Sequence, residues 1–475
     1  MSPERAAAAC LFPGFEGLEP PGWLAPWLAD GLGGVVLFAR NIRDPEQVAE
    51  LTAALRRDQP GLLVATDEEG GDVTRLEAAS GSSYPGNLAL GAVDDVELTE
   101  RVAAAIGGDL AAVGINLDLA PVADVVANPE NPIVGVRSFG SDPALVSRHV
   151  AAFVRGLQGV GVAACAKHFP GHGETVGDSH LELPVADVDR ATLEERALPP
   201  FRAAFEAGAK VVMSAHIRVP SIDEAPATLS RGLLTGLLRD ELGFRGLVMT
   251  DALEMKAVSA TVGMEQGAVR ALAAGADALC LGADLTSGEV ESIHRAIVEA
   301  VRSGRLDETR LEEAAGRVVE TAAWASHPRP HADTEVGGEA ARRALDVEGD
   351  PSLDGPALVV ELRPQATIAA GEAGHGLADV LPRAETVTLR DGDPLPELDG
   401  RRLVLVTRDA YRHAWQRDLF RPGAVVVETG YPSWRPAGAA AYVATYGAGR
   451  ANLEAAARLL AGAGSSGRST RGSRS

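Results

Sequence analysis

The chain has 475 residues and is 46% hydrophobic, so it is long enough for more than one domain and apolar enough to bury a large core. Its formal net charge is −22 at pH 7. An acidic chain without a basic run argues against nucleic acid, and against an anionic membrane surface, as partners.

Short apolar runs, each ending in polar residues, alternate with helix-like segments through the first part of the chain. Such alternation predicts an α/β fold with a parallel sheet covered by helices, and eight units are what a (β/α)8 TIM-type barrel requires. A doubly wound open sheet is the alternative. The eight runs cover 9–12, 34–39, 62–67, 115–121, 162–168, 211–216, 247–252 and 278–283; the helical segments include 45–57, 98–113, 145–158, 193–207 and 263–274.

Polar side chains follow the ends of these runs. In (β/α)8 barrels, function sits at the carboxyl ends of the strands. One polar residue there is often only solvated, or caps the next helix, but here many converge on one rim. They are Arg40, Asn41, Asp67, Glu68, Glu69, Asp118, Asp124, Lys167, His168, His216, Asp251 and Glu254.

The character of the sequence changes near residue 326, where the barrel expected over 1–325 ends. The segment 326–345 begins S-H-P-R-P-H-A-D-T-E, and its proline and polar content predict a linker. A second alternation predicts a smaller, sandwich-like C-terminal α/β domain over 346–462, and the apolar-poor tail 463–475 should be disordered. The strands expected in this C-terminal domain lie in 357–362, 385–390, 402–408, 424–429 and 440–447, and a helix over 451–461 follows them.

The N-terminal residues M-S-P-E-R-A-A-A-A-C-L-F carry Pro and Glu where a signal peptide would begin, and no run reaches the roughly 18 apolar residues of a spanning helix. We therefore expect a cytoplasmic protein. Its three cysteines, Cys10, Cys165 and Cys280, lie in apolar runs without metal-ligand spacing. Buried free thiols in a reducing compartment are the expected state.

The segment 167–180, K-H-F-P-G-H-G-E-T-V-G-D-S-H, concentrates titratable side chains on a glycine-rich backbone. A helical metal site would need its histidines on one face, but Pro170 and the glycines prevent a helix. Barrel metallohydrolases usually carry a His-x-His on the first strand, and that strand has no histidine here. The pattern therefore disfavours a metal site.

A catalytic dyad is a second interpretation of this segment. Asp178 and His180 lie two residues apart, so the carboxylate can orient the imidazole while the ring transfers protons near neutral pH. A polar surface loop with an incidental histidine remains open. The preceding strand weakens that alternative, because it delivers Lys167 and His168 to the same rim.

Further charged residues suit roles around such a dyad. Asp251, in V-M-T-D-A-L-E-M, is placed to act as a nucleophile or charge stabiliser, or to cap the helix that follows. Asp67 has two glycines shortly behind it, so the backbone there can approach a ligand closely. Arg75 follows, and Arg137 offers a planar fork for hydroxyls or a carboxylate. Each could equally form a structural ion pair.

Four long motifs contain these residues. They are D-E-E-G-G-D-V-T-R-L, N-P-I-V-G-V-R-S-F-G-S-D-P, A-K-H-F-P-G-H-G-E-T-V-G-D-S-H-L-E-L-P and V-M-T-D-A-L-E-M. Together they resemble glycoside hydrolase family 3, and more narrowly its β-N-acetylglucosaminidase branch, over roughly residues 10–325. The C-terminal alternation resembles that family's second domain more weakly.

The resemblance implies a retaining, exo-acting hydrolase of terminal β-linked N-acetylglucosamine, from muropeptides or chitin oligosaccharides, without cofactor or metal. It implies Asp251 as the nucleophile and His180 as the general acid/base, with Asp178 as its partner. It also implies a set of sugar-binding residues, in which the role of His216 is the least defined: Asp67, Arg75, Arg137, Lys167, His168 and His216.

Three other functions stay open. A histidine acid/base is neutral or cationic where most glycosidases have a carboxylate, so phosphate could replace water and make the protein a phosphorylase. A sugar-binding barrel with an inactive site and a metal-dependent hydrolase are alternatives of other classes. A chelator would inactivate the metal-dependent enzyme but not the glycosidase.

Overall fold

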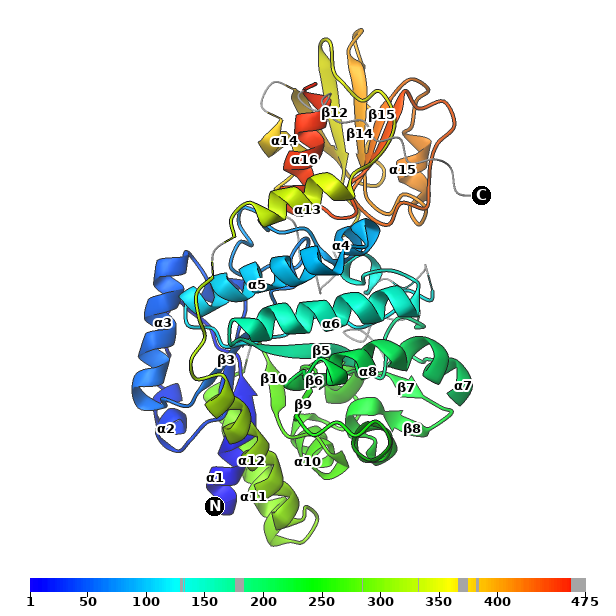
Figure 1. The fold of residues 1–475 in the computed structure, drawn as a ribbon. Coiled ribbons are helices and arrows are strands. Elements are labelled where there is room, and N and C mark those ends of the chain that lie inside the picture. The colour runs from blue at the N-terminus through cyan, green and yellow to red at the C-terminus, as the bar shows by residue number, and fades with distance from the viewer. Residues whose placement is uncertain are drawn as a thin grey trace. The chain divides into compact units, whose positions relative to one another are not determined.

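The computed structural model describes residues 1–128, 131, 133–175, 183–283, 285–331, 333–365, 375–381 and 384–462 (Figure 1). The chain forms two compact units, and the polypeptide enters the second one early. The first unit comprises Met1–Glu69, Val73–Leu76 and Asp94–Val336, and the second comprises Gly70–Asp72, Glu77–Val93 and Gly337–Ser475.

The first unit contains a curled parallel sheet, as the apolar runs predict, and every predicted run overlaps one strand. Six strands pair in sequence order, namely β2 (Gly34–Leu37), β3 (Leu63–Thr66), β4 (Leu117–Asp118), β5 (Ala163–Phe169), β6 (Val211–Ser214) and β9 (Leu247–Thr250). A parallel pair, β1 (Leu11–Pro13) with β10 (Leu279–Gly282), follows, and a parallel bridge from Met249 to Ala278 links β9 to the start of β10. This arrangement is consistent with a (β/α)8 barrel. A doubly wound sheet would reverse its strand order, which these six strands do not do.

Helices connect the strands, and their starts follow from local chemistry. The Asp44 side chain accepts from the Gln47 N–H at 2.8 Å, and Pro45 occupies the first position of α3 (Pro45–Asp58). The other long helices of this unit are α5 (Val96–Ala112), α6 (Pro143–Gly159), α8 (Leu198–Glu206), α10 (Met264–Ala274), α11 (Ser287–Arg302) and α12 (Glu308–Trp324). Shorter helices are α1 (Pro3–Ala9), α2 (Leu24–Ala29), α7 (Arg190–Thr192) and α9 (Lys256–Ser259).

One expected helix, over 193–207, is not continuous. A π-helical turn occupies Leu193–Ala197, and α8 begins at Leu198. Pro199 and Pro200 follow directly and lack the N–H groups that would continue the α-helical bonding of the preceding turn.

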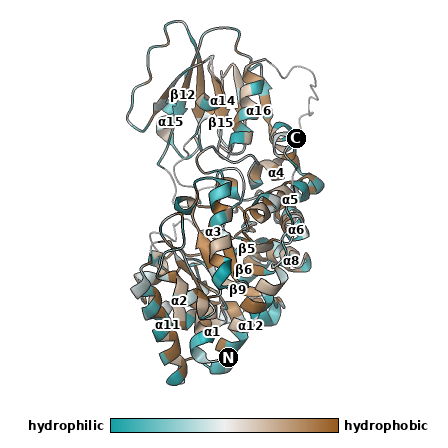
Figure 2. Cartoon of the chain, turned by 90° about the vertical axis from the view of Figure 1, so that its left-hand side faces the viewer, coloured by the Kyte–Doolittle hydropathy of each residue, from teal (hydrophilic) through white to brown (hydrophobic). Residues whose placement is uncertain are grey.

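The core of the first unit lies inside the curled sheet, where alternate residues of the fully buried strands form one apolar cluster. Figure 2 shows these central strands as hydrophobic, while helices such as α11 carry hydrophilic side chains as well. Cys10, Cys165 and Cys280 are buried and free, which confirms the prediction of buried free thiols. Burial raises the pKa of all three thiols, so they stay protonated.

The second unit is built on a mixed six-stranded sheet. Its order is β11 (Asp346–Gly349), β16 (Ala441–Ala444), β15 (Val425–Glu428), β14 (Arg402–Thr407), β12 (Ala357–Leu362) and β13 (Glu385–Leu389), and β11 alone of these described strands is antiparallel to its neighbour. Alternate residues of β12 and β14 enter two apolar clusters, one with α16 (Arg450–Leu460) and one with α15 (Ala414–Asp418). The unit also contains α4 (Asn87–Val93) and α14 (Leu377–Val380).

Two features, one in the second unit and one in the segment 326–345, were not predicted from the sequence. Strand β11 was not expected, because its residues D-V-E-G are largely exposed and carry no apolar run. Half of the segment expected as a linker forms α13 (Val336–Ala344). The expected disordered tail, 463–475, lies outside the described residues.

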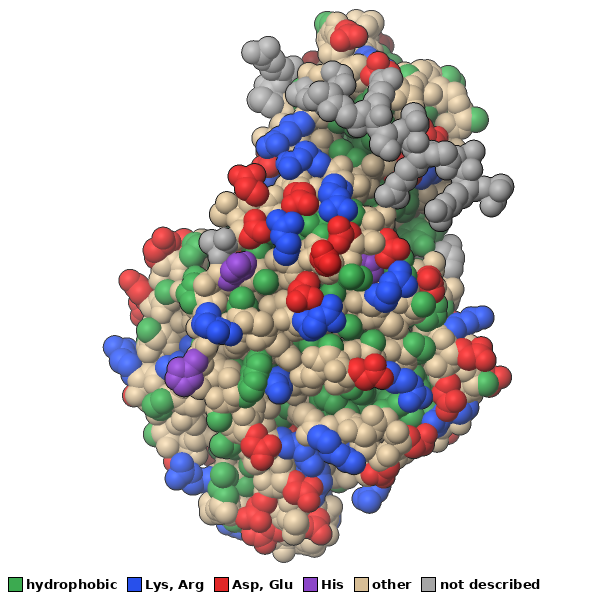
Figure 3. Space-filling view, in the orientation of Figure 1, with side chains coloured by type: hydrophobic (Ala, Val, Ile, Leu, Met, Phe, Trp, Pro, Cys, Tyr) green, Lys and Arg blue, Asp and Glu red, His purple; other side chains and the backbone are tan. Residues whose placement is uncertain are grey.

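The molecular surface agrees with a chain of mixed charge. On the face drawn in Figure 3, basic and acidic side chains are interspersed. Within the described residues, every helix is too short or too polar to cross a membrane.

Candidate active site

Three predicted site residues reach the same place because strand side chains alternate. Asp67, Lys167 and Asp251 each lie two residues beyond a buried side chain of the barrel core, so all three continue the inward-facing row at a carboxyl strand end. The preceding core residues are Ala65, Cys165 and Met249. The period of two thus carries ionisable groups to the inner rim of the sheet.

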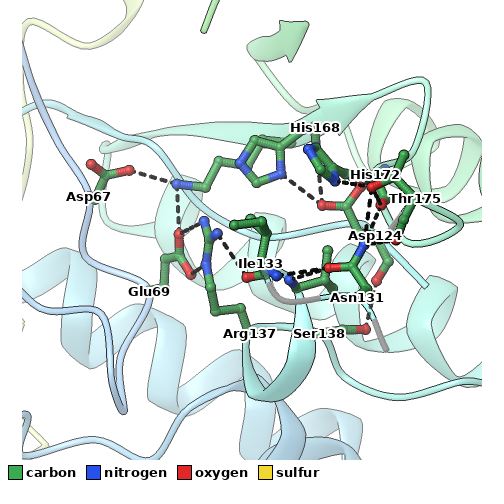
Figure 4. A network of polar contacts seen from close by, with 12 residues as sticks. Asp67, Glu69, Asp124, Asn131, Ile133, Arg137, Ser138, His168, His172 and Thr175 are labelled. Atoms are coloured by element: carbon green, nitrogen blue, oxygen red, sulfur yellow. Dashed lines mark hydrogen bonds and ion pairs between the residues drawn. The ribbon is translucent and has the colours of Figure 1, made fainter. Parts of the chain in front are cut away.

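Lys167 is the centre of a buried ion cluster. Its Nζ lies 2.6 Å from Asp67 Oδ1 and 2.7 Å from Glu69 Oε1, two carboxylates that are labelled in Figure 4. The Lys167 side chain is only 1% exposed. Burial alone would favour the neutral amine, but the two carboxylates outweigh it and raise the pKa of Lys167. The ammonium is therefore permanently charged and holds both acidic side chains in place.

Glu69 joins this lysine to Arg137. The Arg137 fork donates from Nε to Glu69 Oε2 at 2.9 Å and from Nη2 to Oε1 at 2.7 Å, while Nη1 donates to the Ile133 carbonyl at 3.3 Å. Burial opposes ionisation of Glu69, but the two cations hold its pKa well below the ordinary value. Arg137, expected to bind sugar, thus uses its fork on Glu69. From the sequence, Glu69 was one of many polar residues at strand ends, and no particular role was predicted for it.

Asp67 and Arg75 form the part of the cluster that reaches solvent. Their side chains are 18% and 16% exposed, and Arg75 Nη2 lies 3.5 Å from Asp67 Oδ2. Burial raises the pKa of Asp67, but the charges of Lys167 and Arg75 outweigh it and lower the pKa below its usual value. An ionised, partly exposed carboxylate beside a guanidinium can bind a polyhydroxylated ligand.

The loop that carries Arg75 is fixed by buried acidic groups. Glu68 Oε2 accepts from the backbone N–H groups of Arg75 at 2.8 Å and Leu76 at 3.0 Å. The Glu68 N–H donates to Asp118 Oδ1 at 3.0 Å, while Asp118 Oδ2 is buried without a hydrogen-bond partner among the described residues. Burial, and to a lesser extent the Glu68 charge, raise the pKa of Asp118 well above its ordinary value.

Asp124 organises a second cluster. Its Oδ2 lies 2.7 Å from His168 Nδ1, and its Oδ1 accepts the His172 N–H at 2.6 Å. Donation from Nδ1 to Asp124 leaves Nε2 of His168 as the acceptor in the neutral ring. Burial lowers the pKa of His172 to about 4, so this ring is neutral. Asn131 donates to the carbonyls of His172 and Thr175 at 2.8 and 2.9 Å.

Asp251 follows β9 without capping a helix, since the next helix, α9, begins only at Lys256. Its N–H donates to the Ser214 carbonyl at 3.1 Å, and its Oδ1 accepts the Ala252 N–H at 2.8 Å. His216 is fully buried; its Nε2 donates to the Ala252 carbonyl at 3.0 Å, and Nδ1 lies 2.8 Å from Thr228 Oγ1. His216 therefore fixes the peptide next to Asp251.

The predicted dyad, Asp178 and His180, lies outside the described residues. Across the described part of the chain, the acidic, histidine and cysteine side chains form no group of three that could hold a metal ion. Sequence reasoning selected Asp67, Arg75, Lys167 and Asp251, which the fold brings to one rim. It did not select Glu69 and Asp124, although both follow strand ends, because their partners lie far away in sequence.

Comparison with known proteins gives consistent matches. The profile of the Glycosyl hydrolase family 3 N terminal domain matches residues 25–321. Beta-hexosaminidase A of Pseudoalteromonas piscicida is 34% identical over 316 residues, which are 60% of this chain and 52% of that protein, so the match spans about half of that relative. Beta-hexosaminidase of Nitrosomonas eutropha is 35% identical over 265 residues, 54% of this chain and 76% of that protein. The structure of a glycoside hydrolase family 3 beta-N-acetylglucosaminidase from Paenibacillus sp. str. FPU-7 matches with a TM-score of 0.88 and 32% identity, over 97% of each chain.

Proposed function

Since this chain belongs to glycoside hydrolase family 3, we propose that it removes terminal β-linked N-acetylglucosamine from glycosides with retention of configuration. The observation that supports this proposal is the convergence of Asp67, Lys167 and Asp251 at the carboxyl ends of β3, β5 and β9. The name of the similar Paenibacillus protein gives the same sugar, and the name of the Pseudoalteromonas relative gives the broader activity of a hexosaminidase. Muropeptides and chitin oligosaccharides are the substrates proposed.

In this proposal Asp67 and Arg75 bind the hydroxyl groups of the sugar, because they combine charge with partial exposure. Lys167 is 1% exposed and acts by keeping Asp67 ionised and correctly placed. His168, oriented by Asp124, adds a contact from the opposite cluster. Glu69 bonds Lys167, and Arg137 in turn holds Glu69 in place.

The chemistry proceeds in two displacements. Asp251 attacks the anomeric carbon while the bond to the leaving oxygen breaks, and His180 donates its proton to that oxygen. Water then attacks the same carbon, gives its proton to His180 and releases Asp251 from the glycosyl ester. Asp178 orients the imidazole throughout. His216 positions the Asp251 peptide for both steps through the Ala252 carbonyl.

The test is release of p-nitrophenol from its β-N-acetylglucosaminide by the wild type, Asp251→Ala and His180→Ala. Asp189→Ala is a matched control, because it removes an exposed carboxylate that caps α7. We expect the wild type and the control to cleave and Asp251→Ala to be inactive. A wild type that binds N-acetylglucosamine without cleaving the glycoside would make this an inactive sugar-binding barrel.

Two additions to the same assay separate the remaining alternatives. Free N-acetylglucosamine as product in millimolar phosphate identifies a hydrolase, whereas the sugar 1-phosphate identifies a phosphorylase. Incubation with a chelator should leave the activity unchanged. Loss of activity with chelator, restored by a divalent metal, would contradict the proposed mechanism.

A further inference from the structure

A three-residue loop next to the site belongs to the second unit. Gly70–Asp72 directly follow Glu69, yet they pack with the unit that contains Gly337–Ser475. The ends of this loop are joined within the first unit, because the Glu69 N–H donates to the Val73 carbonyl at 3.0 Å. Residues of the site cluster therefore flank a short connector whose middle lies in the other unit.

Asp72, at the end of the connector, is held by two groups of the second unit. Its Oδ2 lies 2.5 Å from Arg408 Nη2, and its Oδ1 accepts the Ala448 N–H at 2.6 Å. The Asp72 side chain is 4% exposed, and that of Arg408 is 27% exposed. The buried Gln416 side chain bonds the N–H and the carbonyl of Arg408 at 2.9 and 2.8 Å, so the backbone of this arginine is fixed as well.

Gly71 is held by close backbone contacts. Its φ of +60° and its N–H bond to the Tyr84 carbonyl, at 2.8 Å, leave no room for a side chain, since a Cβ would lie 2.5 Å from the Gly86 nitrogen. A Cβ on Gly449 would lie 2.9 Å from Gly71 Cα. The connector is thus enclosed by the second unit on both sides.

The second unit also holds the chain beyond Arg75. Arg450 Nη2 lies 2.6 Å from Glu77 Oε1, and the Ala451 N–H donates to the Ser82 carbonyl at 3.1 Å. Asp67 and Arg75, the partly exposed members of the site cluster, therefore lie on a segment held by the second unit at 70–72 and again from residue 77 onward. Both side chains are therefore linked through a few residues of chain to positions that the second unit holds.

We propose that Asp72 and Arg408 are positioning residues for sugar binding, acting through the connector on Asp67 and Arg75. The proposal rests on the function proposed above. It gives the C-terminal part of the chain a defined role: its Arg408–Asp72 ion pair sets the geometry of the sugar-binding loop, without a contact between Arg408 and the substrate.

The experiment compares Arg408→Ala, Arg408→Lys and Asp72→Asn with Arg401→Ala. Arg401 is a matched control, because it precedes β14 while Arg408 follows it, and it pairs with Glu385 and Asp399 instead. Two quantities are measured: KM and kcat for p-nitrophenyl β-N-acetylglucosaminide, and hydrogen–deuterium exchange of the peptide over residues 67–76.

For Arg408→Ala we expect kcat/KM to fall about tenfold, mainly through a higher KM, because a displaced binding group costs ground-state and transition-state binding alike. Amide exchange over residues 67–76 of this variant should be several-fold faster than in the wild type. Arg408→Lys should restore part of both the KM and the exchange rate. Arg401→Ala should match the wild type in both. Asp72→Asn preserves the shape of the side chain and removes its charge, so it should raise the KM and the exchange rate as Arg408→Ala does. It replaces Arg408→Ala in the test if that variant does not fold.

Unchanged KM and unchanged exchange in folded Arg408→Ala or Asp72→Asn would overturn the proposal. A general loss of stability would instead accelerate exchange throughout the second unit, and lysine would not restore KM; that result would also overturn it. If the wild type cleaves no N-acetylglucosaminide, the proposed function fails, whereas the exchange comparison still decides whether Arg408 positions residues 67–76.

Discussion

Two buried charge clusters lie at opposite ends of the strands of the first unit, and they are built differently. The carboxyl-edge cluster consists of Asp67, Glu69, Lys167 and Arg137, and most of its contacts join one side chain to another. The amino-edge cluster consists of Asp277, Arg239, Arg310 and Arg317, and much of its bonding goes to the backbone.

The amino-edge cluster joins the starts of strands to a helix. Asp277 Oδ2 accepts the Val248 N–H at 2.9 Å, and Arg239 donates to the Gly246 carbonyl at 2.6 Å. Arg310, on α12, donates from Nη2 to Asp277 Oδ1 and to the Ala276 carbonyl, both at 2.6 Å. These bonds fix β9, β10 and α12 together.

The comparison distinguishes the candidate active site from a structural ion network. At the amino edge, backbone carbonyls use the guanidinium donors and one carboxylate is enclosed by three arginines. At the carboxyl edge, the Lys167 and Arg137 side chains bond mainly to carboxylates, and Asp67 and Arg75 remain partly exposed. We therefore expect changes at the two edges to separate activity from stability.

The largest effect is expected for Asp251→Ala. Loss of the proposed nucleophile should lower kcat by about 10⁴-fold or more, because the proposed mechanism forms the glycosyl ester on this carboxylate. The free energy of unfolding should change far less than kcat, since Asp251 is only partly buried. Steady-state kinetics and urea unfolding check both parts. If the variant lost stability but kept its kcat, the carboxyl edge would serve stability, which is the opposite of the role proposed for it.

At the opposite edge, Asp277→Asn should destabilise the fold by about 3–5 kcal/mol, because it leaves three arginines around a neutral side chain. The kcat measured at low temperature should stay near the wild-type value. Chemical unfolding and kinetics at the same temperature test this. Asp307→Asn is the matched control on α12, because Asn caps helices as well as Asp does.

Glu69→Gln should reveal the stability held at the carboxyl edge. The folded pKa of Glu69 is lowered, so its ionised form stabilises the fold above the ordinary pKa, and this contribution is lost as pH falls through the folded value. The variant should lose about 2–3 kcal/mol at neutral pH and depend less on pH in acid than the wild type. Unfolding curves between about pH 3 and pH 7 measure this, with exposed Glu320→Gln as the control. Parallel curves for Glu69→Gln and the wild type would contradict it.

The smallest effect is expected for Asp118→Asn. The folded pKa of Asp118 is raised, so its contribution is favourable below the unfolded pKa and is lost as pH rises through the folded value. Asn preserves the neutral shape at every pH. Relative to the wild type, the variant should therefore gain about 1 kcal/mol between about pH 4 and pH 7. A relative loss over this range would show that Asp118 is ionised in the folded protein.

Much of the first unit could be predicted from local pattern. Apolar runs located every strand of the curled sheet, because strands buried on both faces need continuous apolar residues. Motif residues at the ends of those runs located Asp67, Lys167 and Asp251, because the period of two continues the inward-facing row to the carboxyl end of each strand.

Pairing, in contrast, was decided only by the tertiary structure. Lys167 meets Glu69, 98 residues earlier in the chain, and Asp124 meets His168 because parallel register brings neighbouring strand ends together. Arg137 could bind a sugar or a carboxylate by its sequence, and the fold directs its fork to Glu69. His216 lies at a strand end like Asp251, but only packing shows that it is fully buried.

The sequence by itself determined where strands begin and which ionisable groups follow them, since both depend on neighbours along the chain. The tertiary structure decided which groups pair, which stay exposed, and that Gly70–Asp72 belong with Arg408 rather than with the strand that precedes them. Those outcomes depend on contacts between residues tens to hundreds of positions apart, which no local periodicity records.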